Sequence, residues 1–272
     1  MQHMNTHLEF DRTIRIAVIR SLIERGRAPE AHELAADYDC SLELVEASLT
    51  RLHEHHGLVL HPHSHRVWLA HPFSTAPTHF FVERAGDGRM PAGVAPNGKP
   101  AAGGLAPGHA ASDSFASVDN SDDFQAPRGW WANCAKCAMG IVALLGGNAR
   151  IHTRIAAEAE PLTLEFRNNA PATGDIVMHV ALPVSRWWEN VSYTCSTILF
   201  FRDERQVAAW STAHGINHGA ILSLDQAWGL ARQWYGNAAG PEWRRKTAAE
   251  AAALFESLGL IGEFWAVPPN WK

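Results

Sequence analysis

The feature that most restricts how this chain can fold is the 44-residue segment 85–128, half of which is alanine, glycine or proline. It contains 10 Ala, 7 Gly and 5 Pro. A segment of this kind buries too little apolar surface to offset the conformational entropy that it would lose on ordering. We therefore expect a disordered insertion or linker here, which leaves residues 1–84 and 129–272 as the folded parts.

The N-terminal part shows a helical pattern followed by a hairpin pattern. Apolar side chains recur at helical spacing in three consecutive stretches, and Ser41 is a suitable N-cap for the third. Two short apolar runs, 58–60 and 66–69, would then pair as strands. Three helices and a hairpin are typical of a winged helix. We predict a winged-helix-like module over residues 1–84.

The charge of this module argues against DNA as a partner. Residues 9–83 carry seven basic and eleven acidic side chains, a net charge of −4, within a chain of net charge −5. The third predicted helix presents Glu43, Glu46 and Glu54 against a single Arg51. Carboxylates on a recognition helix would repel phosphates. A thiol-sensing regulator that binds DNA is therefore disfavoured, and a structural or lid role is favoured.

The C-terminal part alternates between strand and helix patterns. Because strands and helices follow one another without a repeat, we predict an α+β domain, with a mixed or antiparallel sheet and packed helices. The expected strands are 150–156, 162–166, 175–182 and an apolar run at 193–201, and the expected helices are 134–145, 204–213, 224–235 and 241–258.

The sequence also limits the cellular compartment in which we expect the protein. No apolar run approaches the roughly 18 residues of a membrane span, and no basic segment followed by an apolar one opens the chain. We therefore expect a cytoplasmic protein without a membrane partner. The four cysteines are too few for a disulfide scaffold, so their thiols are expected to be reduced.

Two of these cysteines, Cys134 and Cys137, form a CxxC motif at the predicted start of a helix. Asn133 is a good N-cap, which would place Cys134 in the first turn. The positive end of the helix and the neighbouring Lys136 would both favour a thiolate at Cys134. Three residues apart on a helix, the two sulfurs would share one face and could bind one ligand.

The motif alone leaves several interpretations open. A redox centre would be expected within a βαβ pattern, and a structural zinc site normally needs four ligands. Two or three thiolates suit a soft ion of low coordination number, such as Cu(I) or Hg(II). Cys195, near the start of the apolar run at 193–201, is the other candidate ligand in this part of the chain. Taken alone, these cysteines could also be semi-buried packing residues.

Longer motifs resemble a known family. They are the winged-helix pattern at the start of the chain, the His-Pro-Phe-Ser-Thr-Ala-Pro-Thr run at 71–78, Trp-Trp-Ala-Asn-Cys at 130–134 and Cys-Ser-Thr-Ile-Leu-Phe-Phe at 195–201. In this order and spacing they resemble the organomercurial (alkylmercury) lyases across most of the chain, with 85–128 as an added insertion.

The resemblance implies a site and a reaction. It places the two catalytic cysteines of the family at Cys134 and Cys195, and it implies thiolate capture of an organomercurial followed by protonolysis of its carbon–mercury bond. The products would be a hydrocarbon and Hg(II), in a role in mercury resistance. No cofactor is implied, because the metal is substrate and product. Low-molecular-weight thiols or a mercury reductase would take the Hg(II) away.

One position departs from the family. The family aspartate stands three residues after the first cysteine, where this chain has Cys137. A thiol there could donate the proton, or it could act as a third metal ligand beside Cys134 and Cys195. The second possibility leaves an alternative function, the non-catalytic binding of Hg(II), Cu(I) or another soft metal. Glu189 and Asp203 are the acids nearest to Cys195 in sequence, and we expect both to be solvated.

Overall fold

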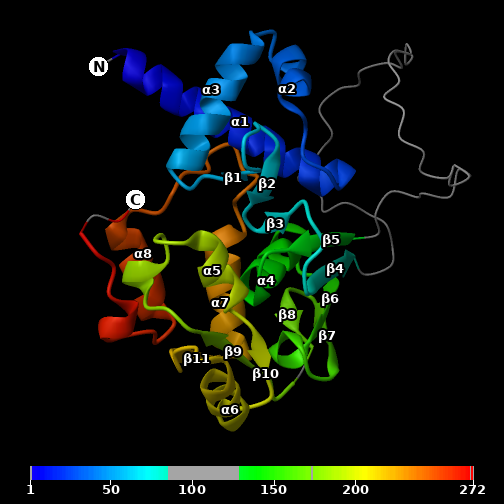
Figure 1. Ribbon diagram of the computed structural model, residues 1–272, viewed down its shortest axis with the longest axis vertical. Coiled ribbons are helices and arrows are strands. Elements are labelled where there is room, and N and C mark those ends of the chain that lie inside the picture. The colour runs from blue at the N-terminus through cyan, green and yellow to red at the C-terminus, as the bar shows by residue number, and fades with distance from the viewer. Residues whose placement is uncertain (1, 85–128, 173, 270, 272) are drawn as a thin grey trace, which may run out of the picture.

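The computed structural model describes residues 2–84, 129–172, 174–269 and 271, with side chains from residue 7 onward. Helices and two antiparallel sheets make up the described chain, which confirms the predicted α+β class (Figure 1). The predicted insertion at 85–128 lies outside the described residues. None of the described helices is both long and apolar enough to cross a bilayer.

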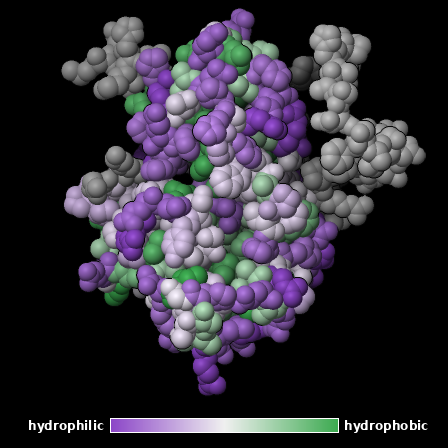
Figure 2. All heavy atoms as spheres, in the orientation of Figure 1, coloured by the Kyte–Doolittle hydropathy of each residue, from purple (hydrophilic) through white to green (hydrophobic). Residues whose placement is uncertain are grey.

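The first three elements are helices that lie together at one end of the molecule (Figure 1). They are α1 (Gln2–Arg25), α2 (Ala31–Asp37) and α3 (Leu42–Glu54). Ser41 is the N-cap of α3, as predicted, because its side chain accepts a hydrogen bond from the backbone N–H of Leu44 at 3.3 Å. On the face shown in Figure 2, hydrophilic residues cover most of the surface at this end, in line with its many charged residues.

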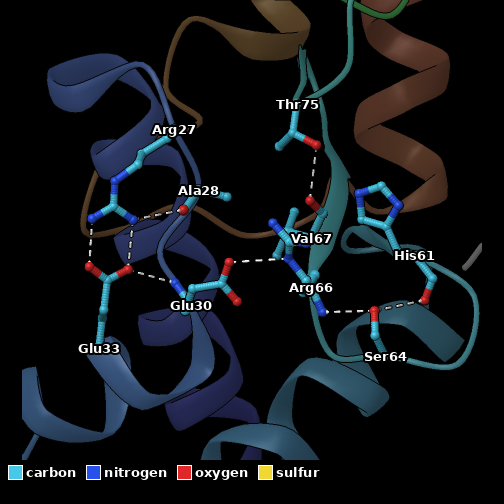
Figure 3. Close-up of polar contacts among 9 residues, drawn as sticks. All are labelled: Arg27, Ala28, Glu30, Glu33, His61, Ser64, Arg66, Val67 and Thr75. Atoms are coloured by element: carbon cyan, nitrogen blue, oxygen red, sulfur yellow. Dashed lines mark hydrogen bonds and ion pairs between the residues drawn. The ribbon is translucent and has the colours of Figure 1, made fainter. Parts of the chain in front are cut away.

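The predicted hairpin follows these helices, and an ion pair connects it to them. Its strands are β1 (Val59–Leu60) and β2 (Val67–Ala70). Figure 3 shows Arg66, next to β2, paired with Glu30 ahead of α2, with Nε and Oε1 3.1 Å apart. Arg27 forms a bidentate pair with Glu33 of α2.

The hairpin continues into a large antiparallel sheet. The strand order is β1-β2-β3-β5-β4-β6-β7-β8, so the sheet runs from the N-terminal module into the C-terminal part without a break. Strands β4 and β5 flank the segment 85–128 and pair directly with each other. The remaining strands are β3 (Phe73–Ser74), β4 (Phe80–Arg84), β5 (Gly129–Ala132), β6 (Ala149–Arg154), β7 (Pro161–Arg167) and β8 (Ala170–Pro171).

A second sheet has β9 (Val177–Val180) between β10 (Phe200–Phe201) and β11 (Ala220–Ser223). The helices of this part are α4 (Ala135–Leu144), α5 (Val191–Ser196), α6 (Glu204–His214), α7 (Leu224–Tyr235) and α8 (Ala248–Ser257), with 3-10 turns at Ile155–Ala157, Val184–Arg186 and Glu263–Trp265.

Two predictions for this region were wrong. The run 193–201 is not one strand, because α5 occupies its first part and only Phe200–Phe201 is extended. The last helix begins at Ala248 rather than at 241, because Thr247 caps it: its hydroxyl accepts from the N–H of Glu250 at 3.2 Å.

Helices α4 and α7 pack closely where Gly140 faces Tyr235, and this contact yields a stability prediction. A Cβ at Gly140 would overlap the ring of Tyr235. Gly140→Ala is therefore expected to destabilise the fold by about 1–3 kcal/mol, which is typical of overpacking. The measurement is thermal unfolding followed by circular dichroism.

Gly229→Ala, on α7, is the matched control. Its added Cβ would meet mainly the flexible end of Leu258, with Cδ2 at 2.7 Å. In a helix this change also gains up to about 1 kcal/mol of propensity. An equal loss of thermal stability in the two variants would contradict a tight contact at Gly140.

Candidate thiol site

Cys134 stands between β5 and α4 and begins the helix itself. Its backbone is extended, and its Sγ accepts a hydrogen bond from the N–H of Cys137 at 3.3 Å. Cys134 is thus the N-cap, and the prediction that Asn133 fills this role was wrong. The side chain of Asn133 instead contacts His71, with Nδ2 and Nε2 3.3 Å apart. The cap directs the sulfur of Cys134 toward the first turn, where Cys137 lies.

Cys195 lies on the short helix α5, whereas the sequence predicted a strand. The helix forms because Asn190 caps it, accepting from the N–H of Tyr193 at 2.9 Å. After α5, the carbonyl of Ile198 accepts a hydrogen bond from the N–H of Ala135 at 3.0 Å. This bond ties the chain after α5 to the start of α4, so the two cysteine-bearing segments lie side by side.

Side chains from four segments converge here. Ligand atoms of His71, Cys137 and Cys195 all lie within 4.8 Å of one another, a group that could hold a metal ion. The Sγ of Cys195 is 3.6 Å from His71 Nε2, and the Sγ of Cys137 is 3.4 Å from the hydroxyl of Tyr235. Cys134 joins through hydrogen bonds to both other thiols. The three cysteines predicted from the sequence therefore meet in one cluster.

Sequence reasoning assigned no role to His71 or Tyr235. His71 opens one of the family-like motifs, but a lone histidine in a loop carries no signal of its own. Tyr235 ends α7 and reaches the thiols only because that helix packs against α4 at Gly140. Nothing in the spacing of the chain points to that contact.

The three thiols differ in their access to solvent. Cys134 and Cys137 are fully buried, and Cys195 is 6% exposed. Of the three, Cys195 alone lines the adjoining cavity, next to His71. A ligand that enters from the cavity therefore reaches Cys195 first.

The ionised thiol of the cluster is Cys137. Burial is the largest effect on this group and opposes ionisation, but hydrogen bonds from Cys134 and Cys195, together with the electrostatic effects of His71 and Lys136, outweigh it. The pKa of Cys137 therefore lies well below the usual value for a thiol. Burial lowers the pKa of His71, although the Cys137 thiolate acts in the opposite direction.

The neighbours of this thiolate keep their protons. Burial and hydrogen bonds to the other thiols raise the pKa of Cys134 well above its usual value. At Cys195 a hydrogen bond with Cys134 acts to lower the pKa, but the hydrogen bond to Cys137 and burial prevail and raise it. The pKa of Tyr235 is also raised, by burial and by the nearby Cys137. The predicted thiolate at Cys134 thus belongs to Cys137 instead.

The cavity beside Cys195 holds about 1390 Å³ of empty space, part of it open to solvent. Trp187 and Trp188 line it, and so do residues 244–246, which the sequence placed within a helix at 241–258. That expectation failed because α8 begins only at Ala248, so the chain before it is free to form the cavity wall.

Acidic side chains stay outside the thiol cluster. Among the described residues, the metal-ligating group contains no carboxylate. Glu189 pairs with Arg186 at 2.8 Å, and Asp203 caps α6 by accepting from the N–H of Gln206 at 2.8 Å. Both are exposed, as predicted.

Residues 124–236 match the family model of the alkylmercury lyases, MerB. None of the curated proteins compared with the chain matches it. Ten chains of solved structures match this chain. One is a crystal structure of the mercury-bound form of MerB2, which is 16% identical with a TM-score of 0.55, and the alignment covers 86% of this chain and 100% of that one. At this identity the likeness shows a shared fold. The organomercurial (alkylmercury) lyase family predicted from the motifs is thus the family that this chain resembles, in sequence over residues 124–236 and in fold over most of its length.

Proposed function

We propose that the protein is an organomercurial lyase-like enzyme that cleaves carbon–mercury bonds at Cys134, Cys137 and Cys195. The observation that carries the proposal is the grouping of three thiols, one facing a cavity and two buried behind it. Thiolates are strong ligands for a soft metal such as mercury. The family match over 124–236 supports the same chemistry.

Capture begins at Cys195, since it is the thiol that the cavity reaches. Its proton passes to the Cys137 thiolate, to which it is hydrogen-bonded. A cation R–Hg⁺ then forms Cys195–S–Hg–R, and Cys137 becomes a neutral thiol. Charge is conserved, because one cation and one thiolate disappear together. Cys137 acts in this step as a general base.

Cleavage uses the second thiol. Cys134 holds its proton because its pKa is raised. When Cys134 binds the mercury, a thiol proton is transferred to the carbon, and Cys195–S–Hg–R plus Cys134–SH gives R–H plus Cys195–S–Hg–S–Cys134. The carbon–mercury bond breaks as the carbon–hydrogen and mercury–sulfur bonds form. Small thiols in solution, or a mercury reductase, would then remove the Hg(II).

A second function is favoured by the metal-ligating group itself. His71, Cys137 and Cys195 could retain a soft ion such as Hg(II) or Cu(I), with Cys134 as a further ligand. A site with this many soft ligands would release Hg(II) slowly. The protein would then serve as a metal trap.

One experiment separates the two functions. Purified protein is given methylmercury with an excess of a small thiol, and methane is measured by gas chromatography. A lyase is expected to release more than one methane per protein. Tight mercury binding without methane would contradict the lyase and leave the trap.

A further inference from the structure

One buried cation connects helix α1 to the thiol site. Arg15 of α1 is 3% exposed. Its three nitrogens each donate to a backbone carbonyl of a different segment: Nε to Gly57 at 3.2 Å, Nη1 to Ala238 at 3.3 Å and Nη2 to His71 at 3.3 Å. Burial, followed by the charge of Arg245, lowers the pKa of Arg15 to about 9, so it stays a cation at neutral pH. A cation is costly to bury, and these hydrogen bonds offset part of that cost.

Two of the three hydrogen bonds, with one ring contact, hold the guanidinium in place. Gly57 follows α3 and Ala238 follows α7, so segments far apart in the sequence accept from the same group. The guanidinium carbon also lies 3.4 Å from the ring centroid of Trp243. A flat guanidinium with its donors in a fixed fork suits this arrangement. Arg15 therefore presents Nη2 to His71 from a fixed position.

The carbonyl of His71 depends on a partner outside the sheet. His71 and Pro72 connect β2 to β3, and the innermost pair of these strands is Ala70 with Phe73. The carbonyl of His71 thus lies beyond the strand ladder, and its hydrogen bond must come from elsewhere. Arg15 supplies it and so fixes the backbone that carries the imidazole.

The imidazole of His71 contacts both cysteine-bearing segments. Its Nε2 is 3.6 Å from Sγ of Cys195 and 3.3 Å from Nδ2 of Asn133, which directly precedes Cys134. A shift of the His71 backbone would move the ring away from both. Partners that hydrogen-bond to metal ligands commonly set the orientation of those ligands and the affinity for the metal. The geometry of the site therefore depends on where His71 is held.

We propose that Arg15 is a positioning residue of the thiol site: it fixes His71, and His71 holds the sulfur of Cys195 beside the other two thiols. The inference rests on the proposed function, because it requires the cluster to bind mercury. It gives α1 a part in the chemistry of the site, although all three cysteines lie in the C-terminal part of the chain.

The test measures how firmly the protein retains Hg(II), by equilibrium dialysis against 2-mercaptoethanol and atomic absorption of the retained metal. Arg15→Lys keeps the charge, but one ammonium nitrogen cannot span the three carbonyls that the guanidinium fork reaches. Its affinity for Hg(II) is expected to fall by about tenfold, the equivalent of about 1.4 kcal/mol. His71→Ala is expected to lose at least as much. Wild-type retention in His71→Ala overturns the proposal without any variant of Arg15.

The two substitutions are then combined, since residues that act as one unit are not additive. In the His71→Ala background, Arg15→Lys is expected to lower the affinity by less than about twofold. An equal tenfold loss in both backgrounds would mean that Arg15 only supports the fold, and would overturn the proposal. The mercury–thiolate charge-transfer absorption gives a second readout: in Arg15→Lys it is expected to resemble that of His71→Ala, and a wild-type spectrum would overturn the proposal.

Arg20→Lys, on the same helix, is the matched control. Nε of Arg20 donates to the carbonyl of Ala239 at 3.3 Å, so Arg20 holds the same turn as Arg15 does. This variant is expected to retain Hg(II) as the wild type does. A tenfold loss here would trace the effect to the turn rather than to His71, against the proposal. Circular dichroism checks that each variant is folded, and Arg15→Gln replaces Arg15→Lys if the latter is not.

The outcome is separable from the proposed function, because retention is measured with Hg(II) alone. Weaker retention in Arg15→Lys, in a protein that releases no methane from methylmercury, would refute the lyase and support the positioning role. Methane release with equal retention of Hg(II) in the wild type and Arg15→Lys would do the reverse.

Discussion

Cys195→Ser is expected to reduce hydrocarbon release from an organomercurial by on the order of 10³-fold or more, as loss of a nucleophile commonly does. Cys195 is the cysteine of the cluster that lines the cavity, and Cys134 and Cys137 lie fully buried behind it. A serine hydroxyl is a hard, weakly acidic group that binds mercury poorly. The measurement is methane released from methylmercury with a fixed excess of small thiol.

Cys40→Ser provides the matched control, since it removes a thiol outside the site. Cys40 is partly buried between α2 and α3. Its loss is expected to leave methane release unchanged. If Cys195→Ser retained wild-type release, capture would not begin at Cys195, and the proposed order of events would be wrong.

Cys137→Asp has the second largest expected effect, in the opposite direction. A carboxyl group at this position would still accept the proton of Cys195, and it would return that proton to carbon as a general acid. It would also remove one soft ligand that retains Hg(II). Steady-state turnover is expected to rise by about 10²-fold, the lower end of what a positioned general acid contributes.

Cys137→Ser separates the two causes of this gain. Serine removes the third soft ligand without supplying an acid, so its turnover is expected to fall below that of the wild type. Both variants are measured under the same thiol excess. An active wild type with no gain in Cys137→Asp would show that Cys137 is already a competent proton carrier.

Most helices and strands could be predicted from local pattern. The helix that follows Ser41 was predicted correctly, because an N-cap and an apolar helix face depend on only a few neighbouring residues. Two predictions were wrong because they relied on apolar patterns of the same short range. At 193–201 the apolar pattern favoured a strand, but Asn190 caps a helix that takes up the first part of the run. The last helix was predicted to begin at residue 241, but it begins at Ala248 because Thr247 is its N-cap.

The chain by itself determined the α+β class, the three thiols and the family that they resemble, because these depend on spacing and on motifs of a few residues. Only the tertiary structure decided which thiol faces the cavity and which one is ionised. Both depend on groups remote in sequence, such as His71 and Tyr235, that meet Cys137 and Cys195 through packing. The cavity likewise brings together charged side chains that lie far apart along the chain, such as Arg15, Lys136 and Glu242. Burial and long-range contacts set these properties, and neither can be read from local pattern.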